Sequence, residues 1–483
     1  MDWLTAPDLW PARWLFTRSL GAIHTIAFVN VVLQFRPLLG ARGLTPVSRY
    51  LEHVGFRRQP SLFHMHHSDR FALAVAWVGV ALSAALTVGL PQAGPVWLHL
   101  VWWLVVWALY LSFVNVGQIW YGFGWESILL EAGFVAAFLG SDRVAPPRLG
   151  IVLVLWLLFR VEVGAGLIKL RGDRCWRDLT CLEYHHETQP LPGPFSWHAH
   201  HLPRWWHRVE ALGNYVAQLL APFALFLPQP TASVAAAVVI VTQGWLVLTG
   251  NFAWLNVLTM VLATVTLADG WLAWLPVDPT VVADPPSSWF TGLVIAVAAV
   301  TLVMSFWPVR NMLSRSQVMN TRYNPLHLVG TYGAFGGITR QRYELVVEGT
   351  IDEEPGPDSE WRPYAFRAKP GDPQRRPPQI APYHLRLDWL MWFAAMSPVV
   401  SHHWVFTLLL RLLEADPHVL GLLRRSPFPD RPPAAVRVLR YRYHFTTPAQ
   451  RRETGAWWVR RRVGEPVPPI RLGDDGQLLR TYL

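Results

Sequence analysis

The sequence predicts an α-helical polytopic membrane protein with eight or nine transmembrane helices and a C-terminal α+β globular domain rich in β-strands. Of its 483 residues, 52% are hydrophobic and only 15% are charged, whereas soluble proteins carry about 25% charged residues. Many apolar runs approach the roughly 20 residues that a helix needs to cross a bilayer. After residue 307 these runs end, and apolar and charged residues alternate as they do in strands.

The predicted transmembrane domain covers residues 1–307. Its candidate spans are residues 15–34, 71–90, 96–116, 124–140, 150–170, 210–228, 232–249, 251–275 and 289–307. The spans 232–249 and 251–275 are so close that we expect a tight helical hairpin at Gly250 and Asn251. We expect no cleavable signal peptide, because the N-terminus lacks a basic segment followed by a short apolar stretch and a small-residue cleavage site.

The predicted C-terminal domain, residues 308–483, is soluble or lies against the membrane. Alternating residues predict strands at 343–350, at 436–445 and around 457–460, while helical spacing occurs at 384–396 and 403–414. These elements predict a small sandwich with one or two helices packed on it. The aromatic residues of 389–393 predict an amphipathic helix that dips into lipid or into a partner's groove.

The distribution of charge makes the lipid bilayer a partner and predicts an orientation. The net charge is +10, and the loops 35–70 and 171–208 are rich in arginine, whereas the loop 269–288 has acidic but no basic residues. With nine spans both basic loops and the C-terminal domain share one side, which the positive-inside rule places in the cytoplasm. The arginines form no recognisable nucleic-acid-binding module, so we expect no nucleic-acid partner.

The source of the chain is also indicated by its basic residues. Lys169 and Lys369 are the only lysines among 42 basic residues. The preference for arginine, together with abundant Ala, Pro and Trp, indicates a GC-rich genome and therefore a bacterial source.

The polar segment 171–208 contains both cysteines of the chain, Cys175 and Cys181, and six histidines: His185, His186, His198, His200, His201 and His207. Five residues separate the cysteines, whereas cysteine pairs at structural zinc sites are usually separated by two to four. We therefore expect no metal and no cofactor, and leave a local disulfide and a pair of free or redox-active thiols as alternatives. We expect the histidines at the membrane interface, among the neighbouring tryptophans.

Five ionisable residues lie within the two predicted spans 124–140 and 150–170: Glu126, Glu131, Arg160, Glu162 and Lys169. Charges at membrane depth are costly unless they are paired, so they face the interior of the bundle or a cavity. We favour a structural ion pair of Arg160 with Glu131 or Glu126 over a proton or ion path. Glu126 and Lys169 lie near span ends and are expected to snorkel towards the interface.

No sequence signature of a catalytic site is present. The chain contains no GxSxG, HExxH or GxGxxG motif. The glycine-rich stretch 330–337 has no Lys-Ser or Lys-Thr after it and opens no helix, which argues against a phosphate-binding loop. We interpret it as a turn that needs positive φ and predict no catalytic residues.

Three segments together resemble the lipase maturation factor family. They are residues 172–181 (GDRCWRDLTC) with 185–192 (HHETQPLP), residues 327–336 (HLVGTYGAFG), and residues 369–394, which include KPGDP, PYH and RLDWLMWFA. The family usually has Asn at position 330, where this chain has Gly330. The resemblance extends from about residue 10 to about residue 465. The chain is identified as a bacterial-type member of this family.

The resemblance implies a non-enzymatic, multi-pass protein of the endoplasmic reticulum membrane that assists the folding and assembly of exported proteins, homodimeric lipases among them. It implies a lumenal C-terminal domain, which in a bacterium corresponds to the periplasmic face of the inner membrane. This conflicts with the orientation that the charges predict. The residues expected to form the motif for the client or for the loop 171–208 are Trp176, Asp178, His185, His186, Glu187, Thr188, Gln189, Pro190, Tyr332, Gly333, Phe335, Asp388 and Trp389.

An alternative is a membrane enzyme that acts on a lipophilic substrate. The helical part distantly resembles the helical domain of vitamin K-dependent carboxylases, and the intramembrane charges would then act on the substrate. A transporter is a weaker alternative, because the two halves of the span series show no internal repeat.

Overall fold

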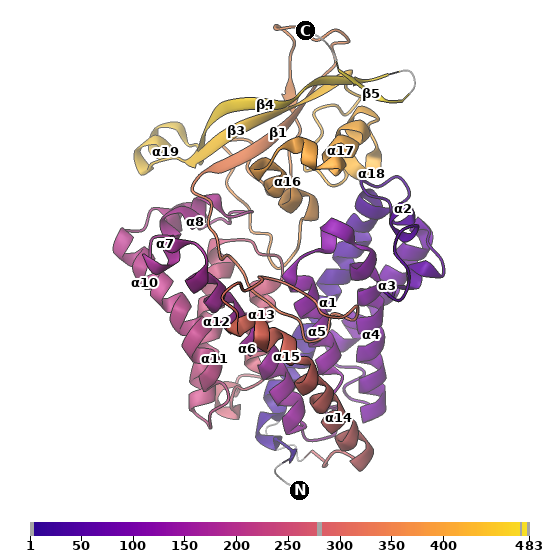
Figure 1. Ribbon diagram of the computed structural model, residues 1–483, viewed down its shortest axis with the longest axis vertical. Helices are drawn as coiled ribbons and strands as arrows, with labels where there is room; N and C mark the ends of the chain where they lie inside the picture. Colours follow the sequence, from indigo (N-terminus) through magenta and orange to yellow (C-terminus); the bar gives the residue numbers. More distant parts are fainter. Residues whose placement is uncertain (1–3, 278–282, 474–475, 481–483) are drawn as a thin grey trace.

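The computed structural model describes residues 4–277, 283–473 and 476–480. A bundle of helices forms one part, and a β-sheet with its own helices lies across one end of that bundle (Figure 1). Helix α1 begins at the opposite end, so the bundle separates the start of the chain from the sheet.

Six helices of the described residues are long and apolar enough to cross a membrane. They correspond to six of the predicted spans and are α1 (Trp10–Leu39), α3 (Asp69–Val88), α4 (Val96–Val116), α6 (Arg148–Arg171), α12 (Thr231–Thr249) and α14 (Ser288–Met304), which continues into α15 (Phe306–Leu313). These helices confirm a polytopic membrane architecture.

The other three predicted spans are not continuous helices of membrane length. Helix α5 (Gly124–Ala136) and helix α13 (Leu255–Thr264) are short, and 210–228 is divided among α10 (Arg204–Tyr215), a π-helical turn (Val216–Leu220) and α11 (Ala221–Ala224). Pro222 accounts for the last break, because its ring lacks an N–H and clashes with the carbonyl group four residues earlier. Part of the predicted loop 269–288, residues 278–282, lies outside the described residues.

The connections between helices gather at the two ends of the bundle. At the end where α1 begins, Ala6 N donates to Pro146 O (2.9 Å) and Ala145 N donates to Asp284 O (2.8 Å). At the other end, Gln118 Nε2 donates to Thr45 O (2.9 Å). The loops 35–70 and 171–208 both lie at this second end beside the sheet.

The C-terminal part has one antiparallel sheet in the order β2-β1-β3-β4-β5. Its strands are β1 (Arg342–Thr350), β2 (Arg362–Pro363), β3 (Ala435–Phe445), β4 (Trp458–Leu472) and β5 (Leu478–Arg480). Strands and helices occur where they were predicted, but the expected sandwich is wrong for the described residues. Helices α16 (Arg386–Met396) and α17 (His403–Leu413) pack on the sheet instead and supply the second apolar layer that it needs.

Helix α16 does not dip into lipid, contrary to its predicted role. It lies between the sheet and the bundle (Figure 1), and Trp389 and Met391 are buried, while Phe393 is 38% exposed. Both sides of the helix are covered because the bundle contacts it from below and β1 from above. The apolar residues that suggested a membrane surface therefore form the core between the two parts.

Short helices complete the connections. They are α2 (Val47–Leu51), α7 (Arg174–Arg177), α8 (Leu182–Thr188), α9 (Ser196–His200), α18 (Pro417–Leu420) and α19 (Pro448–Thr454), with 3₁₀ turns at Pro7–Leu9, Leu62–His64, Gln118–Tyr121, Asp269–Trp271 and Val399–Ser401. Helices α7, α8 and α9 lie in the segment 171–208, which packs at the same end of the bundle as the sheet.

Candidate functional site at the junction of bundle, loop and sheet

The three segments that carry the family resemblance meet at the junction between the bundle and the sheet. Trp176 Nε1 donates to Phe335 O (2.8 Å), which joins the first segment to the second. Trp392 Nε1 donates to Thr188 O (3.2 Å), which joins the third segment to the first. Residues that are more than 150 positions apart are therefore in direct contact, and we take this junction as the candidate site.

Aromatic rings fill the centre of the junction. Phe252 lies 5.0 Å from Phe335 and 6.0 Å from His185 between ring centroids, and 6.5 Å from Trp389. Burial lowers the pKa of His185 to about 3, so this ring is neutral at physiological pH. His185 is thus part of the packed core of the junction, whereas we expected the histidines of this segment among its tryptophans at the membrane interface.

The segment 171–208 is closed by a disulfide between Cys175 and Cys181. The Asp173 carboxylate caps helix α7 by accepting from Cys175 N (3.0 Å). Of the alternatives left by the sequence, the structure contains the disulfide, and neither sulfur is free to bind zinc. Asp178 lies outside the junction, where it forms an exposed pair with Arg174 (3.2 Å).

Glu187 fastens the segment 171–208 to the sheet. Its carboxylate accepts from Phe445 N (2.8 Å) and lies 3.1 Å from His444 Nδ1. The carbonyl groups of Glu187, Gln189 and Pro190 all accept hydrogen bonds from the Arg342 guanidinium. The polypeptide between α8 and α9 thus lies against β1 and the end of β3.

Gln189 fastens the same segment to the bundle. Its Nε2 donates to Thr249 O (2.7 Å), at the last residue of α12, and to Ser196 Oγ (3.0 Å). Gly250 is required at this point, because a Cβ there would lie 2.1 Å from Gln189 Oε1. The predicted turn between α12 and α13 is therefore also the docking point of the segment 171–208.

Arg342 and Lys369 share one buried carboxylate inside the sheet domain. Arg342 Nη2 lies 2.5 Å from Glu344 Oε1, and Lys369 Nζ lies 3.1 Å from Glu344 Oε2. No role was predicted for Arg342 or Glu344 from the sequence. Their signal was the pair of opposite charges two residues apart at the start of a predicted strand, where both side chains point to the same face.

A second buried ion pair joins the two parts of the protein. Arg386 Nη1 at the start of α16 donates to Glu126 Oε1 (2.7 Å) in α5, and both side chains are fully buried. Arg386 also donates to Asn30 Oδ1 (2.9 Å) in α1. Glu126 was one of two alternative partners predicted for Arg160, but it pairs with Arg386 instead and is buried, so it does not snorkel to the interface. The positive charge of Arg386 stabilises the Glu126 carboxylate inside the junction.

His384 lies beside this pair. Its Nδ1 is 3.8 Å from Glu126 Oε1, and its ring stands edge-on to Trp125 and Phe123. Burial, followed by the positive charge of Arg386, lowers the pKa of His384 to about 4. The ring is therefore neutral at physiological pH, and Arg386 supplies the charge that balances Glu126.

The predicted pair of Arg160 with Glu131 is confirmed. The two side chains form a buried salt bridge. Tyr332 donates to Glu131 Oε2 (2.7 Å), and Arg160 Nη1 donates to Gly330 O (2.8 Å). The segment 327–336 is thus bound to α5 and α6, and at position 330, where the family usually has Asn, the contact uses the backbone.

The glycine-rich stretch does not form the predicted positive-φ turn. Positive φ occurs at His327, Val329 and Phe335, which are not glycines. Glycine is needed instead for close approach, because a Cβ at Gly333 would lie 2.9 Å from Met319 O. The stretch is held in its strained conformation by its contacts with the bundle.

The remaining predicted residues have structural partners of their own. The Asp388 carboxylate accepts from Ala368 N (2.7 Å) and Lys369 N (2.9 Å), and burial raises its pKa. Glu162 Oε1 accepts from Gln243 Nε2 (2.7 Å). Lys169 Nζ donates to Gln218 Oε1 (2.9 Å), so this lysine is buried and does not snorkel to the interface.

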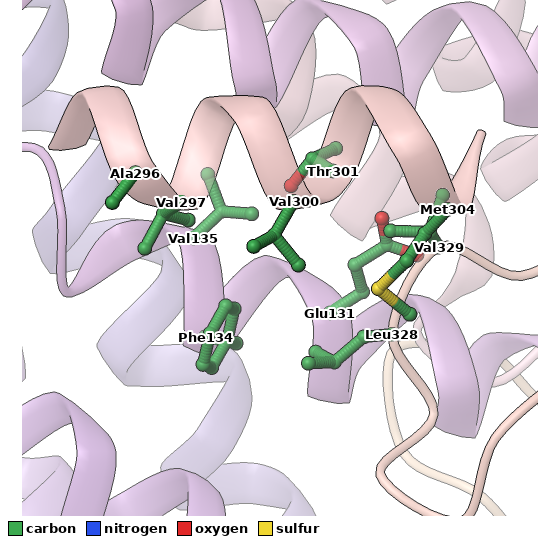
Figure 2. A pocket seen from close by; sticks show the side chains of 10 residues that line it. All are labelled: Glu131, Phe134, Val135, Ala296, Val297, Val300, Thr301, Met304, Leu328 and Val329. Atoms are coloured by element: carbon green, nitrogen blue, oxygen red, sulfur yellow. The ribbon is translucent and has the colours of Figure 1, made fainter. Parts of the chain in front are cut away.

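Two cavities adjoin the junction. The first has a volume of about 170 Å³ and lies between α5 and α14, where apolar side chains line it and Glu131 closes one end (Figure 2). The second, of about 220 Å³, is more polar and contains Asn115, Arg322 and His327. Both cavities are smaller than the roughly 300–1,000 Å³ of ordinary ligand pockets. In the first cavity, the Glu131 carboxylate already forms a salt bridge with Arg160.

Comparisons with known proteins identify the family. A family model described as "Lipase maturation factor transmembrane domain" matches residues 11–274, and one described as "Lipase maturation factor C-terminal domain" matches residues 328–468. The chain belongs to the lipase maturation factor family. It is 40% identical to lipase maturation factor 1 of Homo sapiens, over 98% of this chain and 89% of that protein.

Other lipase maturation factors are similar over most of their length. Identity is 39% to lipase maturation factor 1 of Mus musculus, with 98% of this chain and 89% of that protein covered. It is 30% to lipase maturation factor 2 of Homo sapiens, with 97% and 84% covered. No solved structure matches the chain significantly.

We expect the variant Arg386→Met to lower the thermal unfolding temperature of the purified protein by several degrees. Removing one partner of a buried ion pair costs about 3–5 kcal/mol, because the other charge remains buried and unbalanced. Tryptophan fluorescence during heating in detergent measures the change. The double variant Glu126→Gln/Arg386→Met should recover part of the loss. Arg362→Met, in an exposed pair with Glu360, is the control, and an equal loss there would contradict the assignment.

We expect both cysteines to resist alkylation until a reductant is added. Cys175 and Cys181 are joined in the folded protein, so an alkylating reagent under denaturing conditions should add no mass. After reduction it should add the mass of two labels. Mass spectrometry of the intact chain provides the measurement, and two labels without reductant would show free thiols.

Proposed function

We propose that this protein is a membrane-embedded maturation factor that assists the folding and assembly of exported proteins, with lipases as its clients. The observation that carries the proposal is its similarity to lipase maturation factor 1 over 98% of the chain. The similarity includes both the transmembrane and the C-terminal family models. It therefore concerns the whole architecture and not only a membrane anchor.

Residues 1–307 serve as the membrane-embedded support and residues 308–483 as the platform for the client. The motif residues Trp176, His186, Tyr332 and Trp389 are buried, so we assign them to holding the platform on its support. Contact with the client then falls to the exposed surface of the same end. The side chains of Phe195 and Trp205 are 50% and 61% exposed there and belong to the segment 171–208.

The proposed maturation role is non-enzymatic. Glu126, Glu131 and the other predicted intramembrane charges are bound to protein partners, which supports a structural role for them. The alternative of an enzyme acting on a lipophilic substrate is not supported by the relatives described above, which are named lipase maturation factors.

The bundle contributes nine membrane-embedded segments in this proposal. The three short ones, α5, α10 with α11, and α13, run between the two ends of the bundle in alternation with the long helices. All three pack against α6 or α12, and short or broken helices are tolerable at membrane depth where neighbouring helices surround them.

The C-terminal domain faces the lumen of the endoplasmic reticulum or, in a bacterium, the periplasm. The disulfide lies in the segment that packs against this domain, and disulfides persist in oxidising compartments. Positive charge in the loops argues for the cytoplasm, but long domains are translocated largely regardless of charge. The arginine-rich composition favours a bacterial source and hence the inner membrane.

Co-expression with a lipase tests the proposed function. In cells without their own lipase maturation factor, we expect this chain to raise the activity per amount of secreted lipase. Arg386→Met should lose most of this effect and Arg362→Met should keep it, with both normalised to the amount of variant in the membrane. Unchanged lipase activity with the wild-type chain would contradict the proposal.

Reporter fusions at the C-terminus test the orientation in a bacterial host. We expect alkaline phosphatase, which is active only in the periplasm, to be active, because the disulfide-containing end faces the oxidising side. A fluorescent protein that matures only in the cytoplasm should remain dark. The reverse pattern would favour the orientation that the arginines predict.

A further inference from the structure

A cluster of two histidines and one glutamate lies beside the junction, in the segment 171–208 and the helix that follows it. His186 belongs to α8, and His207 and Glu210 belong to α10. The atoms that these side chains could offer to a metal ion all lie within 4.8 Å of one another. The side chains are 1%, 3% and 6% exposed, respectively.

The distances within the cluster are close to those of a metal site. His186 Nε2 lies 3.3 Å from Glu210 Oε2, and His207 Nδ1 lies 4.0 Å from the same oxygen. Bonds of about 2.0–2.1 Å at tetrahedral angles place two ligand atoms of Zn²⁺ about 3.3 Å apart. The first pair already has this separation. The widest separation in the cluster, up to 4.8 Å, has to close by up to about 1.5 Å when the ion binds.

One nitrogen of the cluster that could bind an ion has no partner. His207 Nδ1 is buried, lies 4.0 Å from Glu210 Oε2 and makes no hydrogen bond to any described residue. A proton on His186 Nε2 would satisfy Glu210 but would leave this nitrogen unpaired, and a buried polar atom without a partner is costly. A cation between the three groups would satisfy His186 Nε2, His207 Nδ1 and the Glu210 carboxylate together, while His186 Nδ1, which is also buried without a partner among the described residues, would be unaffected.

We propose that His186, His207 and Glu210 form a binding site for Zn²⁺. Two imidazoles and one carboxylate are an established zinc ligand set, with water or another ligand in the fourth position. His207 and Glu210 are three residues apart on one helix, so both side chains project from the same face. Trp245 Nε1 donates to Glu210 Oε1 (2.7 Å), which orients the carboxylate from the side opposite the site.

The bound ion would connect α8 to α10. Helix α8 follows the disulfide and precedes Glu187 and Gln189, which fasten the segment 171–208 to the sheet and to α12. Zinc would therefore hold the start of this segment against the bundle. This ligand set contains neither cysteine, and the cysteine spacing, which argued against a metal, does not bear on it.

Metal analysis of the full-length protein tests the site. Protein purified in detergent is stripped with a chelator, dialysed against Zn²⁺ and assayed for bound metal, and Co²⁺ is used as a spectroscopic probe. We expect one Zn²⁺ per chain, visible absorption typical of tetrahedral Co²⁺, and a higher unfolding temperature with Zn²⁺ than without, because the ion binds the folded state.

Three variants decide between this site and adventitious binding to the many histidines. His207→Gln and Glu210→Gln should each weaken Zn²⁺ binding by more than the roughly 10–100-fold that is lost when a group hydrogen-bonded to a metal ligand is removed. Each variant should also abolish the Zn²⁺-dependent rise in unfolding temperature. His53→Gln, in an exposed loop, should behave as wild type. Unfolding of the metal-free variants at the wild-type temperature shows that they fold. Equal Zn²⁺ binding by wild type, His207→Gln and Glu210→Gln, or none by wild type at micromolar free Zn²⁺, would overturn the proposal.

Discussion

The buried ion pair between Glu126 and Arg386 is the constraint on which the arrangement of the two parts depends. It joins α5 of the bundle to the start of α16, and Asn30 and Tyr110 complete the hydrogen bonding around it. Either charge alone would be prohibitively costly in this apolar surrounding. The sheet domain therefore cannot separate from the bundle without exposing one of these charges or leaving it buried without a partner. It is fixed in position relative to the membrane part.

The same principle recurs at two further places, where an arginine side chain holds irregular polypeptide. Arg160 binds Gly330 O, and Arg342 binds three carbonyl groups of the segment 171–208. Backbone groups without helix or strand partners need such donors when they are buried. Two long connections are fixed in this way at points where their backbone is irregular, and both contain residues of the family motifs.

A fixed platform at one end of a bundle suits a protein that assists the folding of others. The disulfide closes the segment 171–208, and Glu187 and Gln189 attach it to the sheet and to α12. The motif residues of the lipase maturation factor family thus maintain one rigid surface. Variation on the exposed side of that surface would then be free to adapt to different clients.

The sequence by itself determined the features that depend on local pattern. Apolar length located six membrane helices, and alternation located β1 and β3. Opposite charges in neighbouring spans predicted that Arg160 pairs with Glu131 or Glu126, and Glu131 is its partner. Only the tertiary structure decided that Glu126 pairs with a residue 260 positions away and that α16 is buried by the bundle. The physical reason is that burial requires every charge to have a partner, but local sequence does not specify which distant residue supplies it.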